Sequence, residues 1–191
     1  MVLPIYVYGA EVLREKSKEV DITIPGIGEE LKTLISDMWE TMEKADGVGF
    51  AAPQVGKSIR VLIVDGSVLS DDMPELKDFK RSMINPVIIK ESQETIEYNE
   101  GCLSIPDIHA AVVRPKIITV SYYDENLVKR EEQLDHFACR MVQHEMDHLE
   151  GILFTDLVAP IRKKMLQARL NNIMAGKAKP HYRIVQANRK K

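Results

Sequence analysis

The stretch His144-Glu145-Met146-Asp147-His148 decides most of what the sequence predicts about this protein. Residues four apart in a helix lie on one face, about one turn from each other, so the two imidazoles can bind one metal ion. Glu145 lies about 100° around the helix from His144, at the edge of that face. A carboxylate in this place can move protons beside the ion. The motif therefore predicts metal-assisted hydrolysis, although it supplies only two of the usual three ligands.

The composition is that of an ordinary soluble protein with one hydrophobic core. The chain has 191 residues, of which 45% are hydrophobic and 29% charged. No apolar run approaches the ~20 residues of a membrane span, and the N-terminus shows no signal peptide. Two cysteines are too few for a disulfide framework. We therefore expect a cytoplasmic enzyme with reduced cysteines, no membrane association and no DNA partner.

The charges are unevenly distributed along the chain. No acidic residue follows Asp156, whereas ten lysines and arginines do. We expect residues 1–174 to form a single catalytic metallohydrolase domain and residues 175–191 to form a basic C-terminal tail. Such a tail can dock on a polyanion, although a solvated helix face with a frayed end explains the pattern equally well.

Hydrophobic periodicity predicts helices near both ends of the chain and over the motif. An apolar stripe at helical spacing covers residues 27–44, and further helices are expected over 11–15, 136–149 and 160–174. Asp135 can cap the motif helix, and Gly151 lies just beyond its end.

The segments between these helices predict short strands. Runs rich in Val, Ile, Thr and Tyr, separated by Pro, Gly and Asn, cover residues 60–65, 82–90, 95–99, 110–114, 116–123 and 129–134. Residues 67–79 are typical of an exposed loop. Because the strands follow one another directly, we expect an α+β fold with antiparallel sheets packed around the central H-E-x-x-H helix.

The usual ways of completing the metal site downstream are closed. Metzincins have a third histidine where this chain has Phe154. Thermolysin-like enzymes use a downstream glutamate, but nothing acidic follows Asp156. The third ligand is therefore expected upstream.

Several upstream side chains compete for this place. Cys139 points about 160° away from the ligand face and is interpreted as a small buried group. His136 lies too far along the helix, and His109 is more typical of a strand residue. Cys102 follows Gly101, which lets the backbone come close to another group. A lone loop cysteine is more often inert, but Cys102 is the best candidate for a His₂Cys set.

Three segments together resemble the bacterial-type peptide deformylase family. They are Gly47-Val48-Gly49-Phe50-Ala51-Ala52-Pro53-Gln54, Glu100-Gly101-Cys102-Leu103-Ser104 and Gln143-His144-Glu145-Met146-Asp147-His148. These match G-x-G-x-A-A-x-Q, E-G-C-L-S and Q-H-E-x-D-H in the family's order, and the resemblance covers about residues 1–170. One small departure is Phe50, where the family often has leucine.

The resemblance implies an activity and a cofactor. The family removes the formyl group from the N-terminal formyl-methionine of newly synthesised polypeptides and releases formate. It implies one divalent metal ion, ferrous iron in the native enzyme, replaceable by nickel, cobalt or zinc. The ligand rules alone suit zinc equally well.

The resemblance also implies roles for individual residues. The metal ligands are Cys102, His144 and His148. Glu145 takes a proton from water and passes it to the leaving amine. The side chain of Gln54 and the backbone N–H of Leu103 donate hydrogen bonds to the oxyanion.

The substrate is expected to bind as an added β-strand. The backbones near Val48, Gly49, Phe50 and Gly101 are free of bulky side chains where a peptide would lie. Backbone pairing gives affinity without reading sequence, which suits an enzyme that processes nearly every nascent chain.

The methionine side chain needs an apolar pocket. Phe137 and Met141 share a helix face with His144 and are candidates to line it, with plain core as the alternative.

Charged residues near the site are candidates to brace it. An ion pair between Glu100 and Arg114 is expected to hold the loop that carries Cys102, and Asp147 to brace a neighbouring loop.

Two alternatives stay open at this stage. One is a metallopeptidase that cuts internal bonds, and the other is a metal-binding or RNA-binding protein without catalysis. The basic C-terminal region further suggests docking on ribosomal RNA near the point where nascent chains emerge.

Overall fold

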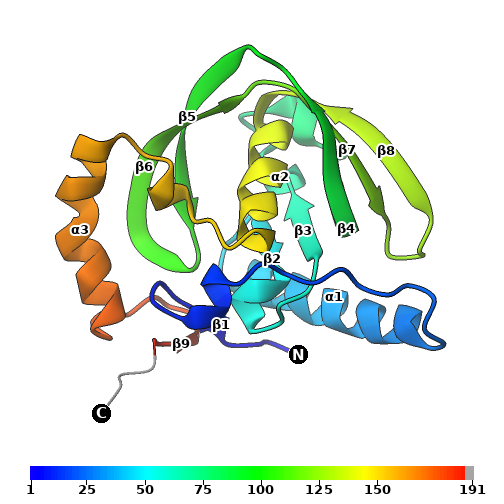
Figure 1. Cartoon of the computed structure of the whole chain (residues 1–191), viewed down its shortest axis with the longest axis horizontal. Coiled ribbons are helices and arrows are strands. Elements are labelled where there is room, and N and C mark those ends of the chain that lie inside the picture. The colour runs from blue at the N-terminus through cyan, green and yellow to red at the C-terminus, as the bar shows by residue number, and fades with distance from the viewer. Residues whose placement is uncertain (188–191) are drawn as a thin grey trace.

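The computed structural model describes residues 1–187. It shows a central helix, α2, with β-sheets around it (Figure 1). The strands are β1 Ile5–Tyr6, β2 Gly49–Ala51, β3 Val61–Asp65, β4 Lys80–Glu91, β5 Thr95–Cys102, β6 Ile105–Pro115, β7 Ile118–Tyr123, β8 Lys129–Leu134 and β9 Ile184–Val185. The helices are α1 Ile27–Lys44, α2 His136–Leu149 and α3 Pro160–Met174. Short 3₁₀ turns cover Glu11–Arg14, Ala52–Val55, Ser67–Leu69, Pro74–Leu76 and Phe154–Asp156.

The sheets have a simple, mostly antiparallel topology. One has five strands in the order β2-β3-β4-β7-β8, and β5 pairs with β6 as a long hairpin. A third pair, β1 and β9, is parallel. In Figure 1, α2 lies between the β5–β6 hairpin and the five-stranded sheet. The predicted α+β class, with antiparallel sheets around the motif helix, is confirmed.

Alternation along β3 explains how two helices pack on one sheet. All five of its residues are buried. Leu62 and Val64 belong to the same core cluster as the buried face of α2, whereas Val61 and Ile63 belong to the cluster formed with α1. Successive side chains of a strand point to opposite faces, so the sheet separates two apolar layers. A third cluster joins β6 to α3.

The bounds of the three α-helices agree with those expected from the apolar periodicity. Residues 67–79 differ from the expected exposed loop, because Leu76 and Phe79 are buried in the core cluster around α2. Asp135 precedes α2 with an extended backbone, but its side chain makes no capping hydrogen bond. No helix of the described part is long and apolar enough to cross a membrane.

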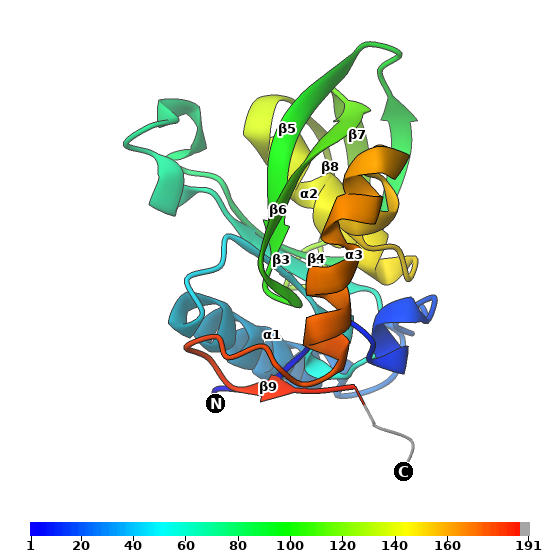
Figure 2. The same cartoon turned by 90° about the vertical axis from the view of Figure 1, so that its left-hand side faces the viewer.

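The chain after α3 returns to the N-terminus, as Figure 2 shows for β9. Strand β9 pairs with β1 in parallel, and the N–H of Ile5 donates to the Arg183 carbonyl at 2.9 Å. The folded part therefore continues past Met174, into the segment expected to form a basic tail. Three of the tail's basic residues, Arg189, Lys190 and Lys191, lie outside the described residues.

Replacing Gly151 by alanine should destabilise the end of α2. Gly151 has φ +72, and an added Cβ would lie 2.5 Å from the carbonyl oxygen of Arg14. We expect the free energy of unfolding, measured by denaturant titration, to fall by about 1–3 kcal/mol. Gly28 is the matched control, because it lies inside α1 and a Cβ there would meet Leu127 only at an ordinary contact distance of 3.7 Å. Gly28→Ala should raise the same quantity by about 0.5–1 kcal/mol. Equal stability of the two variants would contradict this account of Gly151.

Candidate metal centre and active site

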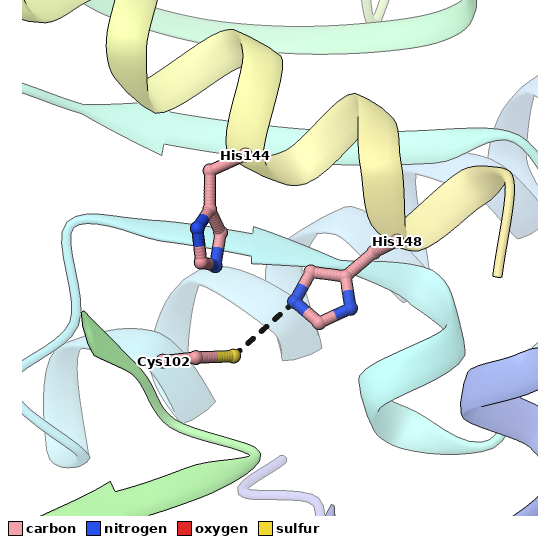
Figure 3. Close-up of side chains that lie close together, drawn as sticks. All are labelled: Cys102, His144 and His148. Carbon is pink, nitrogen blue, oxygen red and sulfur yellow. Dashed lines mark hydrogen bonds between the residues drawn. The ribbon is translucent and has the colours of Figure 1, made fainter. Parts of the chain in front are cut away.

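Three side chains from two elements converge beside α2. His144 and His148 lie one turn apart on the helix, with ring centroids 5.3 Å apart. Cys102 ends strand β5, and its sulfur lies 3.2 Å from Nε2 of His148 (Figure 3). One donor atom from each residue lies within 4.8 Å of the other two. The structure therefore brings together the three predicted ligands, although β5 and α2 are far apart in the sequence.

The hydrogen bonds of His144 suit a metal ligand. Its Nδ1 lies 2.7 Å from Oε1 of Glu100. An ionised carboxylate can only accept, so Nδ1 carries the proton and donates it, which leaves Nε2 for coordination. The chemistry of one thiolate and two imidazoles fits a divalent transition metal.

The electrostatics of the two histidines also fit a cation. Burial alone would lower the pKa of His144, but the Cys102 sulfur and the Glu100 carboxylate hold it well above its usual range. The space between these groups therefore favours positive charge. Burial and the neighbouring His144 instead lower the pKa of His148, so that its imidazole is neutral and can act as a ligand.

Glu100 is the carboxylate that the surrounding groups share. Arg114 donates to it through Nε at 2.7 Å and through Nη2 at 2.9 Å, which is the expected brace of the Cys102 loop. Arg140 donates to it as well, at 2.5 Å. Burial opposes ionisation of Glu100, but Arg114 and His144 hold its pKa well below the usual range. Glu100 is therefore a permanent negative charge two residues from Cys102.

Arg140 is a residue of the candidate site that was not predicted from the sequence. Its guanidinium is buried, donates to the backbone carbonyls of Val112 and Ile96, and lies 5.2 Å from the ring of Tyr98. Its signal in the sequence is an arginine on the otherwise buried face of the motif helix. Asp147 is a second brace, because its Oδ2 accepts from Nη1 of Arg114 at 2.5 Å.

Glu145 lies in a dry environment at the edge of the ligand set. Burial raises its pKa to about 7. Its Oε2 is buried without a hydrogen-bond partner among the described residues, which leaves this oxygen for a reactant. A Cβ on Gly49 would overlap the Glu145 carboxylate, so only glycine allows this approach.

Gln54 is fixed in the 3₁₀ turn that follows β2. Its Oε1 accepts from the N–H of Ala51 at 2.9 Å. Its Nε2 donates to Oγ of Ser104 at 3.0 Å and lies 3.6 Å from the sulfur of Cys102. The amide group therefore directs its N–H bonds toward the loop that carries Cys102 and Leu103.

A cleft of about 320 Å³ is lined by Glu145 and by two of the three candidate ligands, Cys102 and His144. Its walls include five of the six residues predicted to contact substrate, namely Val48, Gly49, Gly101, Phe137 and Met141. Phe50 is the exception, since its side chain is fully buried in the cluster shared with α1. Alternation along β2 points Phe50 away from α2, so only its backbone is left for a peptide. Met141 lines the cleft and also packs in the core.

Strand β2 is one of the two edge strands of the five-stranded sheet, and β8 is the other. Gly49 of β2 and Gly101 of β5 both line the cleft. The cleft is therefore lined by glycine backbone from two strands and by apolar as well as charged side chains of α2. Tyr182, from the C-terminal segment, also lines it and was not predicted.

Replacing Cys102 by alanine should remove most of the bound metal. Loss of even an outer-shell partner costs ~10–100-fold in metal affinity, so loss of a direct ligand should cost on the order of 100-fold or more. The measurement is metal content after dialysis against a weak chelator. Cys139→Ala is the control, because Cys139 is buried against Gln143 rather than in the cleft. Tight metal binding by the Cys102 variant would exclude this sulfur as a ligand.

Comparison with known proteins agrees with this geometry. The family model described as polypeptide deformylase matches residues 2–164. The chain is 46% identical to a peptide deformylase of Flavobacterium psychrophilum, over 96% of each chain. It resembles the crystallised peptide deformylase of Plasmodium falciparum with TM-score 0.80 and 34% identity, over 90% of this chain and 95% of that one. It resembles that of Legionella pneumophila with TM-score 0.79 and 32% identity, over 94% and 99%. The chain therefore belongs to the polypeptide deformylase family.

Proposed function

We propose that this hydrolase removes the formyl group from the N-terminal formyl-methionine of newly synthesised polypeptides and releases formate. The observation that carries the proposal is the ligand set of Cys102, His144 and His148 with Glu145 beside it. A cysteine completes the set where metallopeptidases of this motif use histidine or glutamate. Membership of the deformylase family disfavours an internal metallopeptidase or a protein without catalysis.

The three ligands would hold one divalent ion, and we propose ferrous iron as the native metal from the family resemblance. Zinc, nickel or cobalt can take its place, because sulfur and imidazole suit several of these ions. Such an ion supplies Lewis acidity, which polarises a carbonyl group and lowers the pKa of water towards ~7.

Glu145 is the proton carrier in this proposal. With a pKa of about 7 it can accept a proton near neutral pH and release it again. It takes a proton from water, and the hydroxide attacks the formyl carbon. When the C–N bond breaks, Glu145 gives the proton to the leaving nitrogen. The products are formate and a free amino terminus.

Gln54 and Leu103 would stabilise the oxyanion formed by this attack. The Gln54 amide is held in position by Ala51 and Ser104, so no reorganisation is needed during the reaction. The backbone N–H of Leu103 belongs to the peptide group that follows the ligand Cys102. Loss of one such donor typically lowers kcat by ~10²–10³.

The substrate peptide would lie extended between β2 and the end of β5. Both walls offer backbone at Gly49 and Gly101, so pairing there binds many different sequences. The methionine side chain would enter beside Phe137 and Met141. In this arrangement the enzyme recognises the first side chain of the substrate and makes no demand on the side chains that follow.

The proposed activity belongs in the cytoplasm, where nascent chains emerge. The basic surface of α3 is a candidate for docking on the ribosome. Arg162 and Lys164 are exposed on this helix, and Lys177 lies just beyond it. Two other cations of α3 are already engaged, since Lys163 pairs with Asp156 and Arg169 donates to the Asp107 carbonyl.

Glu145→Ala should abolish turnover while it leaves the metal bound. Loss of a general acid–base group costs ~10²–10⁴ in kcat. Formate release from a formyl-methionyl peptide and metal content are measured on the same preparation. An unformylated peptide serves as the control substrate for internal cleavage. Retained formate release by the metal-loaded variant would contradict the mechanism.

Neutralising the α3 surface should weaken ribosome association without changing catalysis. The triple variant Arg162→Ala, Lys164→Ala, Lys177→Ala should lower the salt dependence of binding by roughly one unit of slope for each phosphate that is no longer neutralised. Sedimentation with ribosomes at several salt concentrations measures this slope. The control carries alanine at Lys57, Lys90 and Lys129, which are exposed elsewhere. Equal slopes for the two triple variants would contradict the docking proposal.

A further inference from the structure

The turn that joins β5 to β6 carries both a metal ligand and an oxyanion donor. Cys102 ends β5, Ile105 begins β6, and these two residues are paired across the turn. Leu103 and Ser104 form its tip. Any tilt of this turn would move the Cys102 sulfur and the Leu103 N–H together.

Three hydrogen bonds hold the turn, each from a different part of the chain. Nε2 of Gln54 donates to Oγ of Ser104 at 3.0 Å. The backbone N–H of Tyr8 donates to the Ser104 carbonyl at 2.8 Å. The hydroxyl of Tyr182 donates to the Leu103 carbonyl at 2.8 Å. The last bond comes from the segment beyond α3 and concerns the same residue as the oxyanion donor.

The environment of Tyr182 suits a fixed donor. Its ring is half-buried against the α1 cluster, next to Leu103. Burial raises the pKa of Tyr182 above its usual range, so its hydroxyl is protonated near neutral pH and can donate. It also faces the cleft, where it forms part of the wall.

The two chain ends hold Tyr182 in place. The N–H groups of Ile5 and Val7 donate to the carbonyls of Arg183 and Val185, at 2.9 and 3.1 Å. The next residue of the N-terminal segment, Tyr8, bonds to Ser104. The same short segment therefore connects the C-terminal strand to the turn. His181 adds a contact to Asp46, at 3.3 Å on the rim of the cleft.

We propose that Tyr182 is a positioning residue for deformylation, which fixes the Leu103 carbonyl and thereby the direction of the Leu103 N–H toward the oxyanion. This inference rests on the proposed function. Only two rotatable backbone bonds of Leu103 separate the peptide group that contains its carbonyl from the peptide group that contains its N–H. A hydrogen bond that anchors the carbonyl therefore limits the rotation of the N–H. A donor held in this way needs no reorganisation as charge develops, which lowers the barrier rather than the binding energy.

Tyr182→Phe in the full metal-loaded chain tests the proposal. A neutral hydrogen bond contributes about 0.5–1.5 kcal/mol, which corresponds to a fall in kcat of about 2- to 12-fold. We expect KM, metal content and melting temperature to stay near the wild-type values. Tyr6→Phe is the matched control, because Tyr6 lies on β1 and its hydroxyl makes no hydrogen bond to the described residues. It should leave kcat unchanged.

A second variant separates positioning from packing. Tyr182→Ala removes the cleft wall together with the hydroxyl, so KM should rise and kcat should fall at least as far as in Tyr182→Phe. An unchanged kcat in Tyr182→Phe, or a change in KM alone, would overturn the proposal. A fall in kcat that is fully explained by a smaller fraction of folded protein would also overturn it. Formate release by the wild type tests the proposed function itself, so the two ideas can fail separately.

Discussion

The buried carboxylate of Glu100 is the constraint on which the site depends. It accepts hydrogen bonds from Arg114 of β6 and from Arg140 and His144 of α2, and it lies two residues before Cys102. The β5–β6 hairpin and the motif helix are thus joined by charged groups next to the proposed metal ligands. Removing one partner of a buried ion pair lowers stability by ~3–5 kcal/mol, so separating these two elements would cost a large part of the folding free energy. The separation between the Cys102 sulfur and the two imidazoles follows from this connection.

The same network gives the carboxylates of Glu100 and Glu145 different pKa values. Arg114 and Arg140 both donate to Glu100, so the charge of this acid is compensated by direct contacts and its pKa is low. Glu145 is buried with no such contact at Oε2 among the described residues, and its pKa rises to about 7. Glu100 can therefore serve as a fixed charge that orients His144, while Glu145 exchanges protons near neutral pH. Paired environments that push two pKa values apart are how acid–base roles are assigned in such sites.

The local part of this arrangement could be predicted from sequence, and the non-local part could not. Helical spacing alone places His144 and His148 on one face, and elimination of downstream ligands points to Cys102. The hydrogen-bond partners of Arg140 are 28, 40 and 44 residues away, so the sequence shows an arginine on the buried helix face but not which groups it contacts. For Phe50 the structure leaves only the predicted backbone contact, because its side chain is buried. A strand alternates, so a Gly49 that faces Glu145 puts Phe50 on the opposite side, toward α1.

The amino-acid composition of the C-terminal segment did not indicate that this segment lines the cleft. Its lysines and arginines suggest a solvated tail, yet the contacts are made by Tyr182 and by the backbone around Ile184 and Val185. A two-residue parallel strand has no periodicity to detect, and its partner is at the other end of the chain. Tyr8 and Tyr182 both donate hydrogen bonds to the turn beside Cys102, so both terminal segments contact the turn that carries the proposed metal ligand and the proposed oxyanion donor. Changes that break the hydrogen bonds of Tyr8 or Tyr182 to this turn should therefore lower kcat more than they lower the stability of the core, because small displacements of an oxyanion donor raise the barrier directly.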